Sequence, residues 1–132
     1  MEAQRLETFK VWRSSILQKS FIFEYSEPAE DSGADVVLPL DLSQYDNIRL
    51  DVRNTESEDG DLIFRLDMAD EGGVLIGGDN NEVLILDFES PKMELFPSDG
   101  EYYYDIMLIA GESTPIIAYG KLNVKLNKTQ RP

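Results

Sequence analysis

Residues 99–109 contain the pattern that most restricts the fold of this chain. Asp99-Gly100 is a turn dipeptide that leads directly into a segment whose alternate residues are large and apolar or aromatic: Tyr102, Tyr104, Ile106 and Leu108. Strict alternation of this kind is typical of a β-strand with one buried face. A second alternating segment at 120–126 is close enough in sequence to pair with the first. The two segments predict neighbouring strands of one sheet.

A tyrosine that opens a strand just after an Asp-Gly turn is also typical of one corner of immunoglobulin-like sandwiches, the corner before the sixth strand. There the tyrosine hydroxyl bonds to the backbone a few residues upstream. Turn residues at sandwich-like spacings separate the other predicted strands, which are 6–12, 19–25, 47–53, 62–68, 74–76 and 83–88. Residues 26–35 form an acidic loop. Residues 36–42 return to the core along an edge, because Pro39 cannot donate to a ladder.

The most regular alternation is at 47–53, where Ile48, Leu50 and Val52 are expected to point inward and Arg49, Asp51 and Arg53 outward. Ser90 as a cap and Pro91 in the first position predict one helical turn that ends near Leu95. A chain of 132 residues fits one domain. The sequence therefore predicts that residues 1–132 form a single all-β domain, an immunoglobulin-like antiparallel β-sandwich of about seven or eight strands with one short helical turn.

Two residue types that carry much of enzyme chemistry are absent. The chain has no cysteine and no histidine, so thiol nucleophiles, cysteine–zinc sites and catalytic triads with histidine cannot form. The glycine pairs at 72–73 and 77–78 are not followed by a lysine and a helix, so they do not match a phosphate-binding loop. We expect a protein that is not an enzyme, with no catalytic residue, no metal ligand and no cofactor.

Clusters of carboxylates raise the alternative of calcium binding. They lie in two loops, at 27–35 and 56–61, and calcium favours several oxygen ligands in a flexible loop. Neither loop fits the twelve-residue calcium loop, and Gly77-Gly78-Asp79 resembles a calcium β-roll repeat that occurs only once. Solvated loops are the favoured interpretation. A carbohydrate- or calcium-dependent adhesion module remains the alternative function.

The distribution of charge is more informative than the net charge of −14. Residues 1–19 carry a net charge of +2, residues 20–112 a net charge of −20, and residues 113–132 a net charge of +4. The acidic body repels the phosphates of nucleic acids and the surface of anionic bilayers, so neither is expected as a partner.

The two basic ends predict one interaction patch. First and last strands of such sandwiches usually lie in the same region, which would bring their cations together. The candidate patch residues are Lys10, Arg13, Lys121, Lys125, Lys128 and Arg131. The alternative is that these lysines only keep exposed strand edges from pairing with other chains.

No apolar run approaches the ~20 residues that a membrane-spanning helix needs. Residues 1–6 lack the basic and then apolar layout of a secretory signal. We therefore expect synthesis in a cytoplasm without a signal peptide.

Several short blocks, in order along the chain, resemble segments of a known family. Pro39–Tyr45 is similar to a Pro-x-Asp-Leu-Thr-Gly-Tyr segment, with Ser-Gln in place of Thr-Gly, and residues 48–53 are similar to a central strand that ends in arginine. The blocks at 100–106, 120–124 and 129–131 follow. The chain resembles small virion proteins of tailed bacteriophages and prophages, in particular the N-terminal domain of the siphophage baseplate upper protein.

This resemblance implies a non-enzymatic structural protein in the tail, the baseplate or on the capsid. It implies a virion location after synthesis in the bacterial host. The partners would be other virion or baseplate proteins, or further copies of the chain, and because the chain ends at Pro132 it would be the stand-alone form of the domain.

Overall fold

The computed structural model describes residues 4–12, 17–28, 35–55, 60–69, 72–88 and 95–125. These residues form eleven strands and one short 3-10 turn. The strands are β1 (Gln4–Arg5), β2 (Phe9–Trp12), β3 (Leu17–Ile22), β4 (Glu24–Pro28), β5 (Asp35–Pro39), β6 (Asn47–Arg53), β7 (Leu62–Asp67), β8 (Val74–Gly77), β9 (Val83–Phe88), β10 (Gly100–Ile109) and β11 (Ile116–Lys125). The all-β class predicted from the alternation of apolar residues is confirmed.

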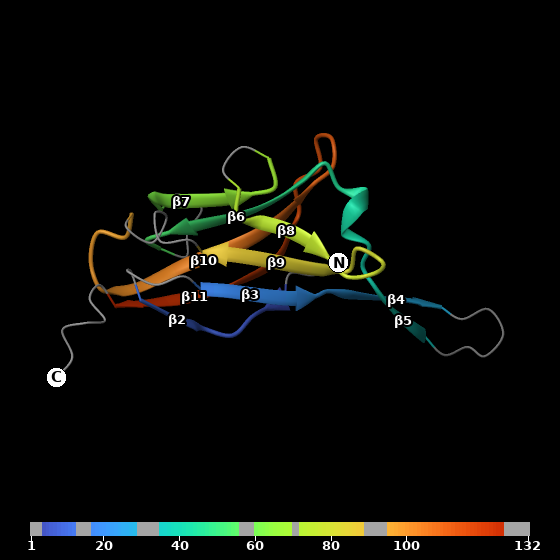
Figure 1. The fold of residues 1–132 in the computed structure, drawn as a ribbon, viewed down its shortest axis with the longest axis horizontal. Coiled ribbons are helices and arrows are strands. Elements are labelled where there is room, and N and C mark those ends of the chain that lie inside the picture. The colour runs from blue at the N-terminus through green and yellow to red at the C-terminus, as the bar shows by residue number, and fades with distance from the viewer. Residues whose placement is uncertain are drawn as a thin grey trace.

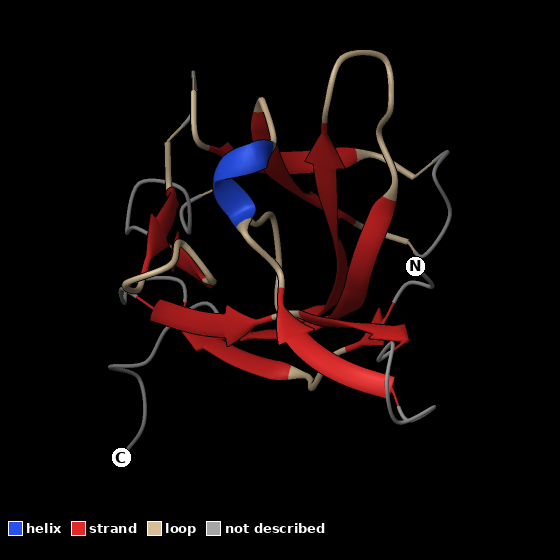
Figure 2. Ribbon diagram, turned by 90° about the vertical axis from the view of Figure 1, so that its right-hand side faces the viewer, coloured by secondary structure: helices blue, strands red, loops and turns tan. Residues whose placement is uncertain are grey.

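Two sheets pack face to face as a sandwich (Figures 1 and 2). The large sheet has the order β1-β11-β10-β6-β7, with β2 also paired to β11, and the small sheet has the order β3-β9-β8. In immunoglobulin nomenclature β6, β10 and β11 correspond to strands C, F and G, β7 to C′, and β3, β9 and β8 to B, E and D. The fold is therefore the predicted immunoglobulin-like sandwich. A third sheet, which consists of β4 and β5 alone, projects from one end of the molecule (Figure 1).

The first and last strands lie side by side. Arg5 of β1 is opposite Tyr119 of β11, and Phe9 of β2 is opposite Leu122. These two pairings are parallel, whereas the other strand pairs are antiparallel as predicted. Residues near both ends of the chain thus share one edge of the large sheet.

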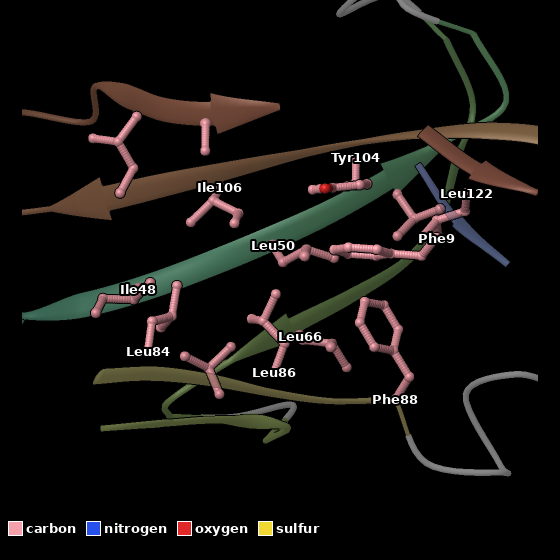
Figure 3. Close-up of a cluster of buried hydrophobic side chains, with 14 of the residues drawn as sticks. Phe9, Ile48, Leu50, Leu66, Leu84, Leu86, Phe88, Tyr104, Ile106 and Leu122 are labelled. Carbon is pink, nitrogen blue, oxygen red and sulfur yellow. The ribbon is translucent and has the colours of Figure 1, made fainter. Parts of the chain in front are cut away.

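Alternate residues of the central strands fill the space between the sheets (Figure 3). The large sheet contributes Ile48, Leu50, Val52, Tyr102, Tyr104, Ile106 and Leu108, all of which are buried as predicted. The small sheet contributes Leu84, Leu86 and Phe88, which have no exposed surface. Burial of one such side chain stabilises the fold by roughly 1.5–3 kcal/mol. This core holds the two sheets rigidly, and the outward residues of each sheet take fixed positions.

Two tyrosines on β10 fix the local geometry of the large sheet. The hydroxyl of Tyr102 donates to the carbonyl oxygen of Ser98 at 2.8 Å, which is the tyrosine corner of immunoglobulin-like folds. Tyr104 lies directly opposite Gly120 on β11, and a Cβ at position 120 would lie 2.5 Å from the Tyr104 hydroxyl oxygen. Only glycine leaves room for this ring. Burial, with the negative charge of Glu7 as a smaller cause, raises the pKa of Tyr104 above its ordinary value.

The predicted strand at 19–25 is two strands that belong to different sheets. β3 pairs with β9, whereas β4 pairs with β5. Between them Phe23 is buried, and its carbonyl oxygen accepts a 2.7 Å hydrogen bond from the N–H of Leu40. Beyond Phe23 the chain leaves the sandwich, and Tyr25 is exposed.

The predicted acidic loop at 26–35 is largely a hairpin. β4 continues to Pro28 and β5 begins at Asp35, and residues 29–34 lie outside the described part of the chain. The sequence here lacks apolar alternation because the hairpin pairs with itself and covers no core. Pro39 ends β5, and none of the other described strands pairs with the second edge of β5, as its proline predicts.

The helical turn predicted to end near Leu95 lies outside the described residues apart from Leu95 itself. A 3-10 turn at Leu42–Gln44 was not predicted. Oδ1 of Asp41 caps it by accepting from the N–H of Ser43 at 2.9 Å and from its hydroxyl at 2.6 Å. These hydrogen bonds hold the pKa of Asp41 below its usual value. Leu42 is fully buried, so the turn ties this connection to the core.

Candidate protein interface

The predicted basic patch falls on the outer face of the large sheet. Along β11, buried residues alternate with the outward residues Tyr119, Lys121, Asn123 and Lys125. Lys10 on β2 is opposite Asn123, so it joins the same face. Arg13, Lys128 and Arg131 lie outside the described residues.

The structure divides the described patch lysines between two hollows. Lys10 and Lys125 line a small one of about 220 Å³, together with Val11 and Asn123. Because β2 is also an edge strand, Lys10 can either contact a partner protein or keep that edge from pairing with the strands of other chains. Lys121 belongs to a different and larger pocket.

The larger pocket has a volume of about 470 Å³ and is built from four strands of the large sheet. Its charged and aromatic lining consists of Arg5, Arg53, Tyr103, Asp105, Tyr119 and Lys121. Lys121 and Tyr103 are direct cross-strand neighbours, and the Lys121 ammonium lies 5.8 Å from the centre of the Tyr103 ring. Arg5 and Tyr119 form the next cross-strand pair, at the edge of the sheet. Tyr119 is 44% exposed although it is aromatic.

An ion-pair network borders this pocket and fixes one wall. Asp51 is only 2% exposed although it points to the outer face. Arg65 donates to it from Nε at 2.7 Å and from Nη2 at 3.2 Å. The guanidinium of Arg53 bridges two carboxylates, with 3.2 Å to Asp51 and 3.1 Å to Asp105.

The Arg53 bridge explains why two acidic residues can lie directly opposite each other on neighbouring strands. Asp51 and Asp105 are cross-strand partners, and like charges in that position repel. Arg53 lies between the two carboxylates, Arg65 adds a second positive charge at Asp51, and the Arg53 side chain is thereby held in one orientation. The network makes this part of the sheet surface a rigid, preorganised element.

Sequence reasoning identified Lys121 but missed the other residues of its pocket. The alternation at 47–53 placed Arg53 outward, and the parity of β10 placed Tyr103 outward. Neither pattern reveals which residue is opposite on the next strand, and Arg5 lies in a strand of two residues with no periodic signal. The cross-strand register brings these side chains together.

The small sheet carries an apolar surface on its outer face. Ile22 of β3 and Leu75 of β8 are 57% and 54% exposed. They flank β9, where Val83 is opposite Ile22 and Ile85 is opposite Leu75. Apolar surface of this kind, rimmed by polar residues, is a common feature of contact surfaces between proteins.

No protein-family model matches this chain, and no curated protein matches it.

Among the described residues, no three carboxylates lie close enough together to hold a metal ion. Most of the two acidic clusters considered for calcium, residues 29–34 and 56–59, lies outside that part of the chain. The described residues also contain no helix that is long and apolar enough to cross a membrane.

Proposed function

We propose that this chain is a non-enzymatic structural protein of a phage or prophage virion, located in the tail or baseplate or on the capsid. It acts by contact with other proteins. The ordered resemblance of its sequence blocks to phage virion proteins motivates the proposal, and the immunoglobulin-like sandwich is a suitable scaffold for it. The absence of histidine and cysteine from the whole chain is consistent with a contact role.

The observation that carries the contact role is the outer face of the large sheet. In a chain of net charge −14, this face gathers Arg5, Lys10, Lys121 and Lys125 beside exposed Tyr119. Arginine and tyrosine are enriched where protein partners bury surface. Charge complementarity at such a face favours a partner with exposed carboxylates.

Co-purification with phage particles tests this function. A tagged chain, expressed during infection or prophage induction, is expected to sediment with virions and to capture neighbouring tail or baseplate proteins. The variant Lys10→Glu/Lys125→Glu is expected to weaken this capture, whereas Lys19→Glu on the small sheet serves as a control for charge. A chain that never sediments with particles and captures no virion protein would count against the proposal.

The alternative is a carbohydrate- or calcium-dependent adhesion module. The observation that favours its carbohydrate form is the pair Tyr103 and Tyr119 beside cations in one pocket, because aromatic faces can stack on sugar rings. Titration calorimetry with acidic and neutral oligosaccharides tests it, and titration with calcium tests the metal-dependent form. Heat that is lost in Tyr119→Ala would favour this alternative over the virion role.

A further inference from the structure

The larger pocket holds two cations that are available to a ligand. Arg53 is occupied by Asp51 and Asp105. Arg5 and Lys121, in contrast, make no ion pair within the described residues. They flank Tyr119, with Arg5 directly opposite it and Lys121 two residues further along the same face of β11.

The chemistry of the pocket specifies its occupant in part. Two unpaired cations favour carboxylates, and an arginine guanidinium can bind a carboxylate through two parallel hydrogen bonds. The rings of Tyr103 and Tyr119 and the side chain of Ile116 add apolar surface between the charges. The lining therefore fits an extended segment that carries acidic residues next to apolar ones.

The chain itself contains such a segment. Residues 24–35, which include β4 and the start of β5, carry five carboxylates and no cation. β5 continues with Val36 and Val37, and these are 41% and 57% exposed. Among the described strands, β4 and β5 pair only with each other, so their outer edges are available to another surface.

The hairpin cannot occupy the pocket of its own chain. It projects from one end of the molecule, beyond the two packed sheets (Figure 1), whereas the pocket lies on the outer face of the large sheet, beside Tyr103 and Asp105 of β10. The two surfaces are thus complementary in charge and lie apart on one copy. They can meet only between two copies.

We propose that the acidic β4–β5 hairpin of one copy binds in the Arg5–Lys121 pocket of the next copy. This inference deepens the proposed function and rests on it, because it names a second copy as one partner of the virion protein. Such a contact joins two different surfaces head to tail, so repetition produces a closed ring or an open filament.

The net charge of −14 opposes association of two copies at long range. At physiological ionic strength of about 0.15 M, the Debye length is about 8 Å, which screens charges on the distant parts of the two bodies. Contacts between carboxylates and the cations in the pocket are screened much less. The test is therefore made at physiological rather than at low salt.

The experiment is a charge exchange between the two surfaces, read by sedimentation velocity over micromolar to near-millimolar concentrations of the full chain. The pocket variant is Arg5→Glu/Lys121→Glu, and the hairpin variant is Glu24→Lys/Glu27→Lys. Wild type is expected to associate with rising concentration. Each variant alone is expected to associate at least about tenfold more weakly.

A mixture of the two variants is the decisive sample. The acidic pocket of one now faces the basic hairpin of the other, so association is expected to return. Lys19→Glu on the small sheet adds negative charge outside both the pocket and the hairpin, and it should associate like wild type. Circular dichroism and thermal unfolding check that each variant is folded, and Arg5→Gln/Lys121→Gln replaces the reversed pair if it is not.

Three results would overturn the inference: a wild type that stays monomeric throughout, a folded pocket variant that associates like wild type, or a mixture that stays monomeric. A wild-type chain that stays monomeric but still sediments with virions would overturn only this inference and would leave the proposed function supported.

Discussion

The hydroxyl of Tyr102 donates a 2.8 Å hydrogen bond to the carbonyl oxygen of Ser98, across the turn that leads into β10. The N–H of Ser98 in turn points to the same hydroxyl at 3.4 Å. This local loop of hydrogen bonds sets the angle at which the chain enters the centre of the large sheet. Since β10 lies between β11 and β6, that angle positions the strand which carries Tyr103 and Asp105.

Tyr102→Phe is expected to lower the free energy of unfolding by about 0.5–1.5 kcal/mol, because the hydrogen bond to the Ser98 carbonyl is lost while the ring is kept. Chemical denaturation measures this. Tyr103→Phe on the same strand is the control, since its hydroxyl makes no hydrogen bond within the described residues. Equal stabilities for the two variants would show that the corner bond is not stabilising.

Asp51→Ala is expected to cost about 2–3 kcal/mol, since two guanidinium groups then lose their shared acceptor. This is less than the cost for a fully buried pair, because Arg65 is about one third exposed. A double-mutant cycle with Arg65→Met measures the coupling of this pair by denaturation. A coupling near zero would mean that Arg53 alone neutralises Asp51.

Gly120→Ala is expected to destabilise the fold by about 1–3 kcal/mol, because the added methyl group overlaps the ring of Tyr104. Asn123→Ala, on the outer face of the same strand, is the matched control and should change stability little. The double variant Tyr104→Leu/Gly120→Ala should lose less than the sum of the two single changes. Strict additivity would argue that the glycine matters for another reason.

Stability should fall in alkaline solution because of Tyr104. Its pKa is raised in the folded protein above the ordinary value of 10.0, so the folded state favours the neutral phenol. The contribution is complete below that ordinary value and is lost as the pH rises toward the folded pKa. Thermal midpoints measured across this range should fall more steeply for wild type than for Tyr104→Phe. Parallel curves would contradict this.

The sandwich could be predicted from sequence because one buried face imposes a period of two on each strand. Ile48, Leu50 and Val52 show this, as do Ile106 and Leu108. None of the described side chains of the β4–β5 hairpin is buried, so this segment leaves no such period. The sequence pattern accordingly divides residues 24–35 between a strand and a loop.

The pocket could not be predicted, for a different physical reason. Alternation tells which face a residue occupies, but cross-strand neighbours depend on register, which long-range packing sets. Lys121 was a candidate because it is a cation near one end of the chain. That Arg5 lies beside Tyr119 in the same pocket follows only from the parallel pairing of β1 with β11.

That parallel pairing also bears on how the protein is made. β1 and β2 leave the ribosome before the other described strands, yet among these the strand that they bind in the large sheet is β11, which follows all the others in sequence. Until β11 has been made, β2 has no partner in the large sheet. Phe9 and Val11 of the nascent chain are therefore exposed to chaperones or to other chains. Native structure at this edge can arise only after translation has passed residue 125, so Arg5 joins the pocket only once β11 has been made.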